Sequence, residues 1–446
     1  MFGYKFNNTI YLICFRIGIF LLVSAPIISA VFLLISLIHA CVLNWRQFLK
    51  DKWNYLFIIA SILMFFIAFF QSLELNDLSL SIFELKNEEV KEKFINWNSF
   101  SSLIGLSNWL PLFLCFWGFQ SYLSSYDDRK TAAQLFVAGS IPVLVSGFGQ
   151  YWFNWYGPFE TLNGLIIWFQ YEKGGGITSI FSNQNYAGCW LNIVLPFALA
   201  IFCESTKNLL KKGTALMFVI SITVASYLTT SRNAWGGIIF TIPLVFGPAY
   251  FYWIAPILVL FCLIIFLKIM NYVPDNIDSF LSSLLPSKFN IFSQFSPTLY
   301  TDKSYNRDTI FLFALKMIAK KPLIGMGAAT FPIYYYMQND IYMAHAHNLF
   351  IDFAFSYGIV VAIFVFTNIL LIGYSSIKNV YFSKIQDKLP NILFERAWCT
   401  SFIVLLFSQM FDVQYFDLRI SISFWTLLAG MKCIATNSPK EENVLK

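Results

Sequence analysis

Charged residues are scarce in this chain: Asp, Glu, Lys and Arg make up 12% of the 446 residues, against 58% hydrophobic residues. The mean hydropathy is +0.63, and a soluble protein could not bury so much apolar surface. No basic stretch interleaved with aromatic residues is present, which argues against a nucleic-acid partner. The composition therefore indicates an integral membrane protein, with the lipid bilayer as its first partner.

Signals for disulfides, metals and cofactors are also missing. The eight cysteines lie in or beside apolar runs and show neither a disulfide framework nor a metal-ligand spacing. No Asp-x-Asp pair flanks the candidate site residues considered below, and the chain has only three histidines. We therefore expect no metal and no cofactor.

Apolar runs of the length that crosses a bilayer, roughly 17–25 residues, recur along the chain. The stretch Ile10–Leu43 is interrupted at Pro26 and can form one span or two. The other runs are approximately Trp53–Ser72, Ser99–Tyr122, Thr131–Trp152, Gln184–Cys203, Thr214–Thr230, Asn233–Gly247, Phe251–Met270, Asn348–Gly373, Ala397–Phe411 and Leu418–Ile434. They predict an all-α, polytopic integral membrane protein with about 11–12 transmembrane helices.

Lysines and arginines in the short loops orient these spans, because cytoplasmic loops carry the excess of positive charge. The loops assigned to the cytoplasm carry Arg46, Lys50 and Lys52; Arg129 and Lys130; Lys207, Lys211 and Lys212; and Lys378, Lys384, Lys388 and Arg396. Alternating spans satisfy all these loops together and place both termini inside. The same alternation places the loops Glu74–Glu92, Phe153–Asn183 and Asn271–Ala346 outside.

The chain then divides into N-terminal membrane helices (1–270), a large extracytoplasmic loop (271–346), C-terminal membrane helices (347–436) and a cytoplasmic tail (437–446). Within the large loop, apolar residues recur at helical spacing opposite several lysines between Ile310 and Lys321. The apolar set is Ile310, Phe311, Ala314, Leu315 and Ile318. This pattern predicts a helix in the membrane interface that ends before Pro322, with Gly325-Met326-Gly327 forming a tight backbone path.

Two arginines are predicted on the outer side, against the general charge bias. Arg232 follows Thr229-Thr230-Ser231 and could be a snorkelling anchor. Arg307 could pair with Asp302 or Asp308, or contact lipid phosphate. Alternatively both could bind an anionic ligand, because the planar guanidinium contacts phosphate oxygens in a bidentate way.

His345 and His347 stand together with Asn348 at the outer mouth of a predicted span, whereas the third histidine, His39, is expected to be structural. An imidazole that is neutral near pH 7 can remove a proton from a hydroxyl. The alternative is a capping or interfacial role. Asp352 lies one turn beyond Asn348, and a carboxylate inside a membrane is costly enough to indicate a partner or a function.

Together these residues predict transfer of a group from a lipid-anchored diphosphate at the outer surface. The arginines would stabilise the charge on the leaving diphosphate. A histidine would activate the hydroxyl of the acceptor.

The same residues give the chain a resemblance to the O-antigen ligase and Wzy-type polymerase superfamily. The resemblance runs in order from Gly176 to Val361 and includes Thr178–Asn185, Thr230-Ser231-Arg232, Arg307, Lys321–Gly327 and His345-Ala346-His347-Asn348 with Gly358.

This resemblance implies a GT-C-like glycosyltransferase of the bacterial inner (plasma) membrane that uses an undecaprenyl-diphosphate-linked glycan as donor and a lipid or glycan acceptor. Arg232 and Arg307 match the diphosphate-binding arginines, and His347 matches the proposed catalytic base. His345, Asn348, Asn185 and Asp352 are predicted to bind substrate.

A bicarbonate or other small-anion transporter is the alternative, because the segment with Asp412, Asp417 and Arg419 resembles cyanobacterial relatives once described as bicarbonate transporters. A transporter is expected to carry inverted repeats and polar residues near the bilayer midplane. Here the polar residues are predicted at one face, which favours surface chemistry. The choice between ligase and polymerase stays open.

Overall fold

The computed structural model describes residues 2–75, 87–172, 175–205, 208–247, 307–382 and 392–436, with a few single residues between these ranges. Most of the predicted span Phe251–Met270, and all of residues 271–306 and of the tail 437–446, lie outside the described residues. The described elements are α1 (Phe2–Leu21), α2 (Pro26–Phe48), η1 (Lys52–Asn54), α3 (Tyr55–Glu74), α5 (Glu88–Phe94), α6 (Ser101–Ile104), η2 (Gly105–Asn108), α7 (Leu110–Gly118), η3 (Phe119–Tyr122), α8 (Tyr126–Gly139), α9 (Ile141–Phe153), β1 (Phe159–Thr161), β2 (Ile166–Trp168), α10 (Gln184–Glu204), α11 (Leu209–Leu228), α12 (Arg232–Phe246), α15 (Arg307–Lys320), α16 (Phe331–Asn339), α17 (Leu349–Tyr357), α18 (Ile359–Tyr381), α19 (Ile392–Ser408) and α20 (Leu418–Thr436).

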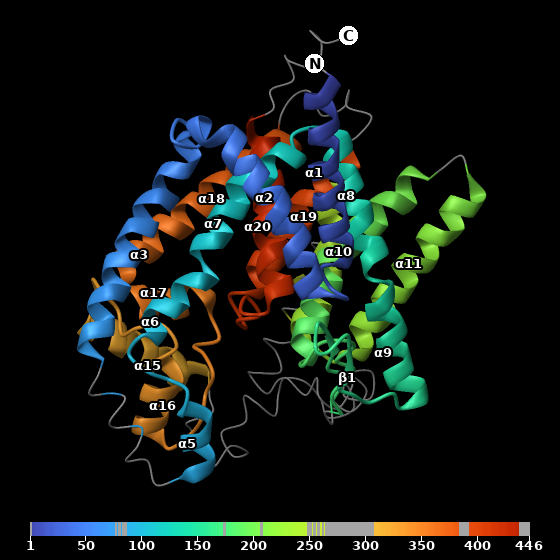
Figure 1. The fold of residues 1–446 in the computed structure, drawn as a ribbon. Helices are drawn as coiled ribbons and strands as arrows, with labels where there is room; N and C mark the ends of the chain where they lie inside the picture. Colours follow the sequence, from blue (N-terminus) through green and yellow to red (C-terminus); the bar gives the residue numbers. More distant parts are fainter. Residues whose placement is uncertain are drawn as a thin grey trace.

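The protein is a helical bundle, as predicted, with one short antiparallel hairpin of β1 and β2 in the described part (Figure 1). Within the same residues, eight helical segments are long and apolar enough to cross a membrane. Both α12 and α19 are shorter than these segments, with 15 and 17 residues. The all-α polytopic fold is thereby confirmed.

The N-terminal stretch forms two helices rather than one span. Pro26 is the first residue of α2, a position that proline favours because the missing N–H would have no helical partner there. The two helices then pack closely, since a side chain at Gly18 would come within 2.6 Å of Leu33. The break at Pro26 therefore creates a helical hairpin.

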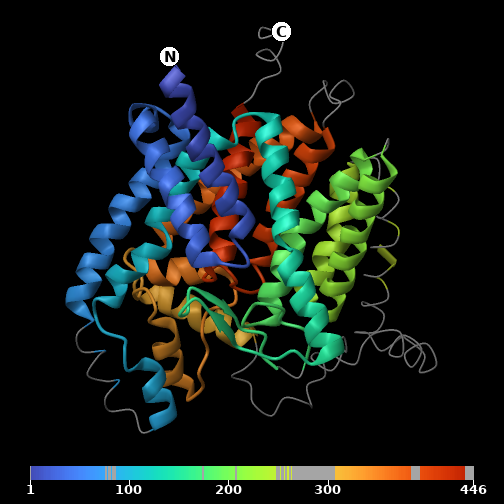
Figure 2. The ribbon, with the colours of Figure 1, turned by 45° about the vertical axis from the view of Figure 1, so that its right-hand side comes forward.

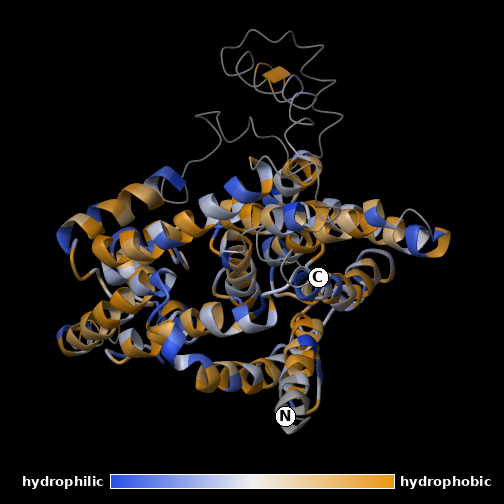
Figure 3. Ribbon diagram, turned by 90° about the horizontal axis from the view of Figure 1, so that it is seen from above, coloured by the Kyte–Doolittle hydropathy of each residue, from blue (hydrophilic) through white to orange (hydrophobic). Residues whose placement is uncertain are grey.

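Two helices form the centre of the bundle. In α10 and α20, 78% and 83% of the apolar window is buried, against 28% in α2 and 22% in α11. Large rings fill the centre, and Trp398 donates a hydrogen bond to the Leu427 carbonyl at 2.9 Å. Gly430 gives that ring its space, because a Cβ there would lie 2.3 Å from it. The peripheral helices are largely hydrophobic, as expected for lipid-facing surfaces (Figure 3).

Some predicted spans are not continuous helices. The run Thr131–Trp152 is divided at Ser140, directly before the Ile141-Pro142 start of α9. The run Ser99–Tyr122 contains two 3₁₀ segments, η2 and η3. These runs were predicted from apolar length alone, which does not register a local change of helix type.

A third correction concerns the run Asn348–Gly373, which the structure divides into α17 and α18. Gly358 separates them with φ +87°, and a Cβ there would lie 2.3 Å from the Leu323 carbonyl oxygen. The predicted tight path of Gly325 and Gly327 is confirmed, with φ values of +69° and +110°. The backbone of this loop is joined to the end of α17, because the Met326 N–H donates a hydrogen bond to the Phe355 carbonyl at 2.7 Å.

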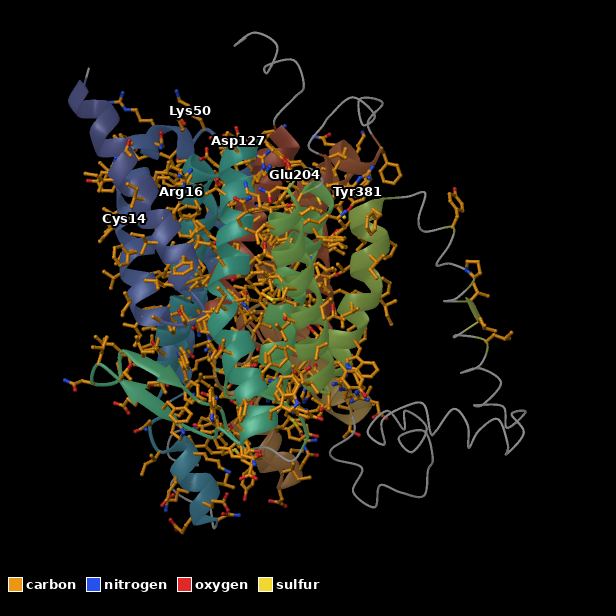
Figure 4. All side chains as sticks on the ribbon, turned by 90° about the vertical axis from the view of Figure 1, so that its right-hand side faces the viewer. Cys14, Arg16, Lys50, Asp127, Glu204 and Tyr381 are labelled. Atoms are coloured by element: carbon orange, nitrogen blue, oxygen red, sulfur yellow. The ribbon has the colours of Figure 1, made fainter. Side chains whose placement is uncertain are left out.

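The segments assigned to opposite sides of the membrane lie at opposite ends of the bundle. Lys50, Asp127, Glu204 and Tyr381 lie toward one end, and the β hairpin with α5 lies at the other (Figure 4). We call the end with the hairpin, α15 and α16 the loop end (Figures 1 and 2). This arrangement agrees with the predicted alternation of spans, while the assignment of the loop end to the outside stays a prediction.

The predicted helix of the large loop is present as α15, and it ends before Pro322 as expected. Its buried face differs from the predicted one, because Phe313 and Met317 are buried while Leu315 is 51% exposed. The Phe313 ring packs edge-on against Tyr335 of α16, and α15 also contacts α17. Ile310, Ala314 and Ile318 of the predicted set are buried, so spacing alone identified most of the buried face and misplaced one edge of it.

Candidate active site

Four of the described helices, α10, α12, α15 and α17, begin at predicted site segments. Asn183 caps α10 by accepting the Asn185 N–H at 2.8 Å, and Asn348 caps α17 by accepting the Ile351 N–H at 3.0 Å. Arg232 and Arg307 are the first residues of α12 and α15. Helix N-termini carry partial positive charge, so these helix starts favour an anionic ligand.

His347 contacts a carboxylate 65 residues further along the chain. Its Nδ1 atom lies 3.0 Å from Asp412 Oδ1, and the Asp412 side chain is only 10% exposed. An ionised carboxylate can only accept, so Nδ1 carries the proton in this contact. The Nε2 lone pair of His347 is consequently available to act as a base.

The hydrogen bonds of the Asp412 carboxylate within the described part of the chain all come from donors. Asn185 Nδ2 and Gln414 Nε2 lie 2.9 and 3.4 Å from Oδ2, on the side away from His347. Burial alone would raise the pKa of Asp412, but the hydrogen bond from His347 and the charges of His345 and Arg307 lower the pKa overall. Asp412 is therefore ionised at neutral pH and fixes the orientation of the imidazole.

His345 belongs to the same group but plays a different part. Its Nδ1 accepts the backbone N–H of His347 at 3.2 Å, and its Nε2 lies 3.8 Å from Asp412 Oδ1. Burial first, and then the charge of His347, lower the pKa of His345 to about 4, although Asp412 opposes this. His345 is thus neutral at pH 7 and helps to shape the loop.

The loop that carries the histidines is held by its neighbours. The Ala346 N–H donates to Asp352 Oδ1 at 3.1 Å, and Asn348 Nδ2 donates to the Met410 carbonyl at 3.0 Å. His347 itself has φ +54°, a backbone conformation that is uncommon for non-glycine residues and is concentrated at functional sites.

The arginines lie within electrostatic reach of this loop. Desolvation and the neighbouring Arg232 lower the pKa of Arg307, and Asp412 opposes them. The start of α12 is positioned by the preceding turn, in which Thr230 has φ +54° and its hydroxyl donates to the Gly175 carbonyl. Two neighbouring cations beside helix N-termini form a site that a diphosphate would stabilise.

His345, His347 and Asp412 could also hold a metal ion, since their ligand atoms lie within 4.8 Å of one another. The donor set of two imidazoles and one carboxylate would suit Zn²⁺ or a similar ion. However, the shared Asp412 oxygen and both Nδ1 atoms already have hydrogen-bond partners in the protein. The prediction of metal independence is therefore a question for experiment.

The acidic and basic residues further along the chain divide between two roles. Asp417 forms an ion pair with Arg419, and the guanidinium lies 4.0 Å from the centre of the Phe181 ring. The charges of Asp417 and Arg419 therefore neutralise each other. Asp412, in contrast, belongs to the histidine site.

The structure brings most of the predicted site residues together. His345, His347 and Asn185 all lie against the Asp412 carboxylate. Desolvation and the charge of Arg232 lower the pKa of Arg307. The polar groups of Asn348 and Asp352 hold the loop, and their predicted role in substrate binding stays untested. Asp412 was missed as a site residue, because its contact with His347 joins residues that lie 65 positions apart in the chain.

The fold and site define a polytopic membrane protein with a cationic, histidine-containing site at one end of its bundle. Residues 216–366 of the chain match the family model described as O-antigen ligase. No curated protein matches the chain. The match covers about a third of the chain and supports the resemblance to the O-antigen ligase and polymerase superfamily, whose members are enzymes of glycosyltransferase type. The matched range includes Arg232, Arg307 and His347. Asn185 and Asp412 lie outside this range, and the fold brings them into contact with each other and with His347.

Proposed function

We propose that this protein transfers a glycan from an undecaprenyl-diphosphate donor to a hydroxyl group of a lipid or glycan acceptor at the outer face of the membrane. The observation that carries the proposal is the contact between His347 Nδ1 and Asp412 Oδ1 at 3.0 Å, with Arg307 close enough for the charge of Asp412 to oppose the lowering of its pKa by desolvation. A buried carboxylate that holds an imidazole with its second nitrogen unprotonated is the arrangement required for general base catalysis.

The proposed reaction assigns each proton and bond to a group of this chain. The acceptor oxygen attacks the anomeric carbon of the donor sugar while His347 Nε2 takes the hydroxyl proton. The bond between that carbon and the phosphate oxygen breaks, and undecaprenyl diphosphate leaves with the electron pair. Asp412 stabilises the resulting imidazolium.

Arg232 and Arg307 are proposed to hold the diphosphate. Charge increases on the departing phosphate oxygen during the reaction, so donors that are already in place stabilise the transition state more than the ground state. The N-termini of α12 and α15 add partial positive charge at the same positions. The arginines therefore contribute to the chemical step as well as to donor binding.

The transporter alternative has less support from the described residues. Asp417 and Arg419, which suggested it, neutralise each other, and Asp412 is hydrogen-bonded into the histidine site. Arg307 begins α15, which lies at the loop end rather than in the middle of the bundle (Figure 1). This distribution favours chemistry at a membrane surface.

The test is a reconstituted transfer assay with purified protein, undecaprenyl-diphosphate oligosaccharide and a lipid or glycan acceptor. His347→Ala should reduce transfer by about 10²–10⁴-fold, the usual contribution of a positioned general base. Binding of the donor should persist because the arginines are intact, and a chelator should leave the rate of the wild type unchanged.

In cells, the same variant should accumulate lipid-linked oligosaccharide while the surface glycan disappears. Normal surface glycan together with reduced bicarbonate uptake would refute the transferase and favour the transporter. A chelator-sensitive rate would instead indicate that the histidine group holds a metal.

A further inference from the structure

The Nε2 atom of His347 is covered by a side chain from its own loop. Met343 Sδ lies 3.3 Å from Nε2, while Nδ1 on the other side of the ring is engaged by Asp412. The nitrogen with the free lone pair thus faces a thioether, which has no proton to give to it. Met343 occupies the position that the reacting hydroxyl must reach.

We propose that Met343 is a specificity-determining residue that excludes water from His347 until the acceptor displaces the thioether. The inference rests on the proposed transferase function. Water is the commonest competitor of any acceptor hydroxyl, and a base with an open Nε2 would activate it equally well. The product would then be a free reducing glycan instead of an extended acceptor.

The chemistry of methionine suits this task. Its unbranched side chain has several rotatable bonds and a weakly accepting sulfur, so it covers the nitrogen without forming a strong bond that the acceptor must break. Met343 is half-buried and packs against the main hydrophobic core. Displacement therefore costs some apolar contact, which a lipid or glycan acceptor can replace and a water molecule cannot.

Tyr342, the residue before Met343, holds this segment against α5. The Tyr342 ring lies 5.9 Å from the Phe94 ring and 5.1 Å from Lys93 Nζ, both on α5. The segment between Asp340, which ends α16 with φ +55°, and His345 is therefore anchored next to Met343. This anchoring places the thioether over the imidazole while leaving its side chain free to change rotamer.

The two reactions differ only in the attacking oxygen. In hydrolysis, a water oxygen forms the bond to the anomeric carbon, its proton passes to His347 Nε2, and undecaprenyl diphosphate departs as before. The ratio of hydrolysis to transfer consequently measures how well Nε2 is protected from water. Changes in donor binding affect both reactions equally and cancel in this ratio.

The first test measures protection without any glycan substrate. Diethyl pyrocarbonate acylates unprotonated imidazole nitrogens, and peptide mass spectrometry separates His347 from the internal reference His39. Met343→Ala should be modified at His347 severalfold faster than the wild type. Met343→Leu, which keeps the apolar cover, and Met337→Ala, a control on the half-exposed surface of α16, should both match the wild type.

The second test measures free glycan and extended acceptor in the reconstituted assay. Met343→Ala should raise the ratio of hydrolysis to transfer by about tenfold or more, within the range of a positioned base, and Met343→Leu should restore it. Equal modification of His347 in Met343→Ala and wild type overturns the inference, whether or not the wild type transfers glycan. Faster modification with an unchanged ratio refutes the exclusion of water, whereas a wild type without transfer refutes the proposed function alone.

Discussion

Replacing Asp412 with asparagine tests the site most directly, because the substitution keeps the shape of the side chain and removes its charge. Asp412 Oδ1 accepts from His347, and Oδ2 accepts from Asn185 and Gln414. An asparagine has only one accepting oxygen. Its NH₂ group must face either the imidazole or the two amide donors, and both orientations lose an interaction.

The expected fall in kcat depends on which of the two orientations the asparagine amide adopts. If the NH₂ group faces Asn185 and Gln414, His347 still donates to the amide oxygen but loses the charge assistance, a difference of about 1–1.5 kcal/mol between charged and neutral hydrogen bonds, which corresponds to about tenfold in rate. If the NH₂ group instead faces His347, Nδ1 must accept a hydrogen bond from it. The proton of the imidazole then moves to Nε2, which can no longer act as a base. The analogous change in a Ser-His-Asp triad costs about 10⁴-fold. We therefore expect kcat to fall by about tenfold to 10⁴-fold.

The assay is steady-state transfer by reconstituted protein, with thermal unfolding to verify the fold. Binding of the diphosphate donor should change little, because Arg232 and Arg307 are untouched, so the loss should appear in kcat. Asp340→Asn is the matched control: the residue is exposed with φ +55°, which asparagine tolerates. A kcat for Asp412→Asn equal to that of the control would refute the role assigned to the carboxylate.

The remaining predictions concern the arginine, the loop and the orientation. Arg307→Lys should lose most transfer activity although the charge is kept, because a lysine cannot form a bidentate contact with phosphate; activity close to the wild type would reduce Arg307 to a general electrostatic role. Asp352→Asn should retain activity, since its amide oxygen still accepts the N–H of the histidine loop, whereas Asp352→Ala should lose about 0.5–1.5 kcal/mol of loop stability and show faster amide hydrogen exchange there. In a cysteine-free background, a cysteine at Thr161 should react with an impermeant reagent in intact spheroplasts and one at Lys50 only after lysis; the opposite pattern would reverse the orientation.

The helices could be predicted from the sequence because a bilayer imposes a minimum apolar length. Pro26 also marked a helix start, since its ring excludes it from a helix interior. The division at Gly358 was not predictable in the same way. The glycine is required because the Leu323 carbonyl approaches to 2.3 Å of a Cβ position, and that contact comes from a segment 35 residues earlier.

The candidate site was predictable where its residues are adjacent in the chain. His345, His347 and Asn348 form one motif, and two arginines on the side predicted to be outside contradict the usual charge bias. Asp412 has no such local signal, because its significance arises only when the turn between α19 and α20 meets the start of α17. The Leu349 N–H donates to the Gln409 carbonyl at 2.9 Å and makes that junction, and such tertiary pairing is invisible in a single sequence.

The position of Asp412 also resolves an electrostatic conflict within the site. Arg232, Arg307 and the helix N-termini favour a bound diphosphate, but positive charge disfavours a protonated imidazole beside it. His345, 3.8 Å from the carboxylate, has its pKa lowered to about 4 by burial and cationic neighbours. His347 touches the carboxylate at 3.0 Å, so the negative charge opposes the arginines at the ring that must accept a proton. A site that kept the arginines but lost this carboxylate would bind the diphosphate and fail at proton removal, and the separate measurement of donor binding and kcat in Asp412→Asn distinguishes these two steps.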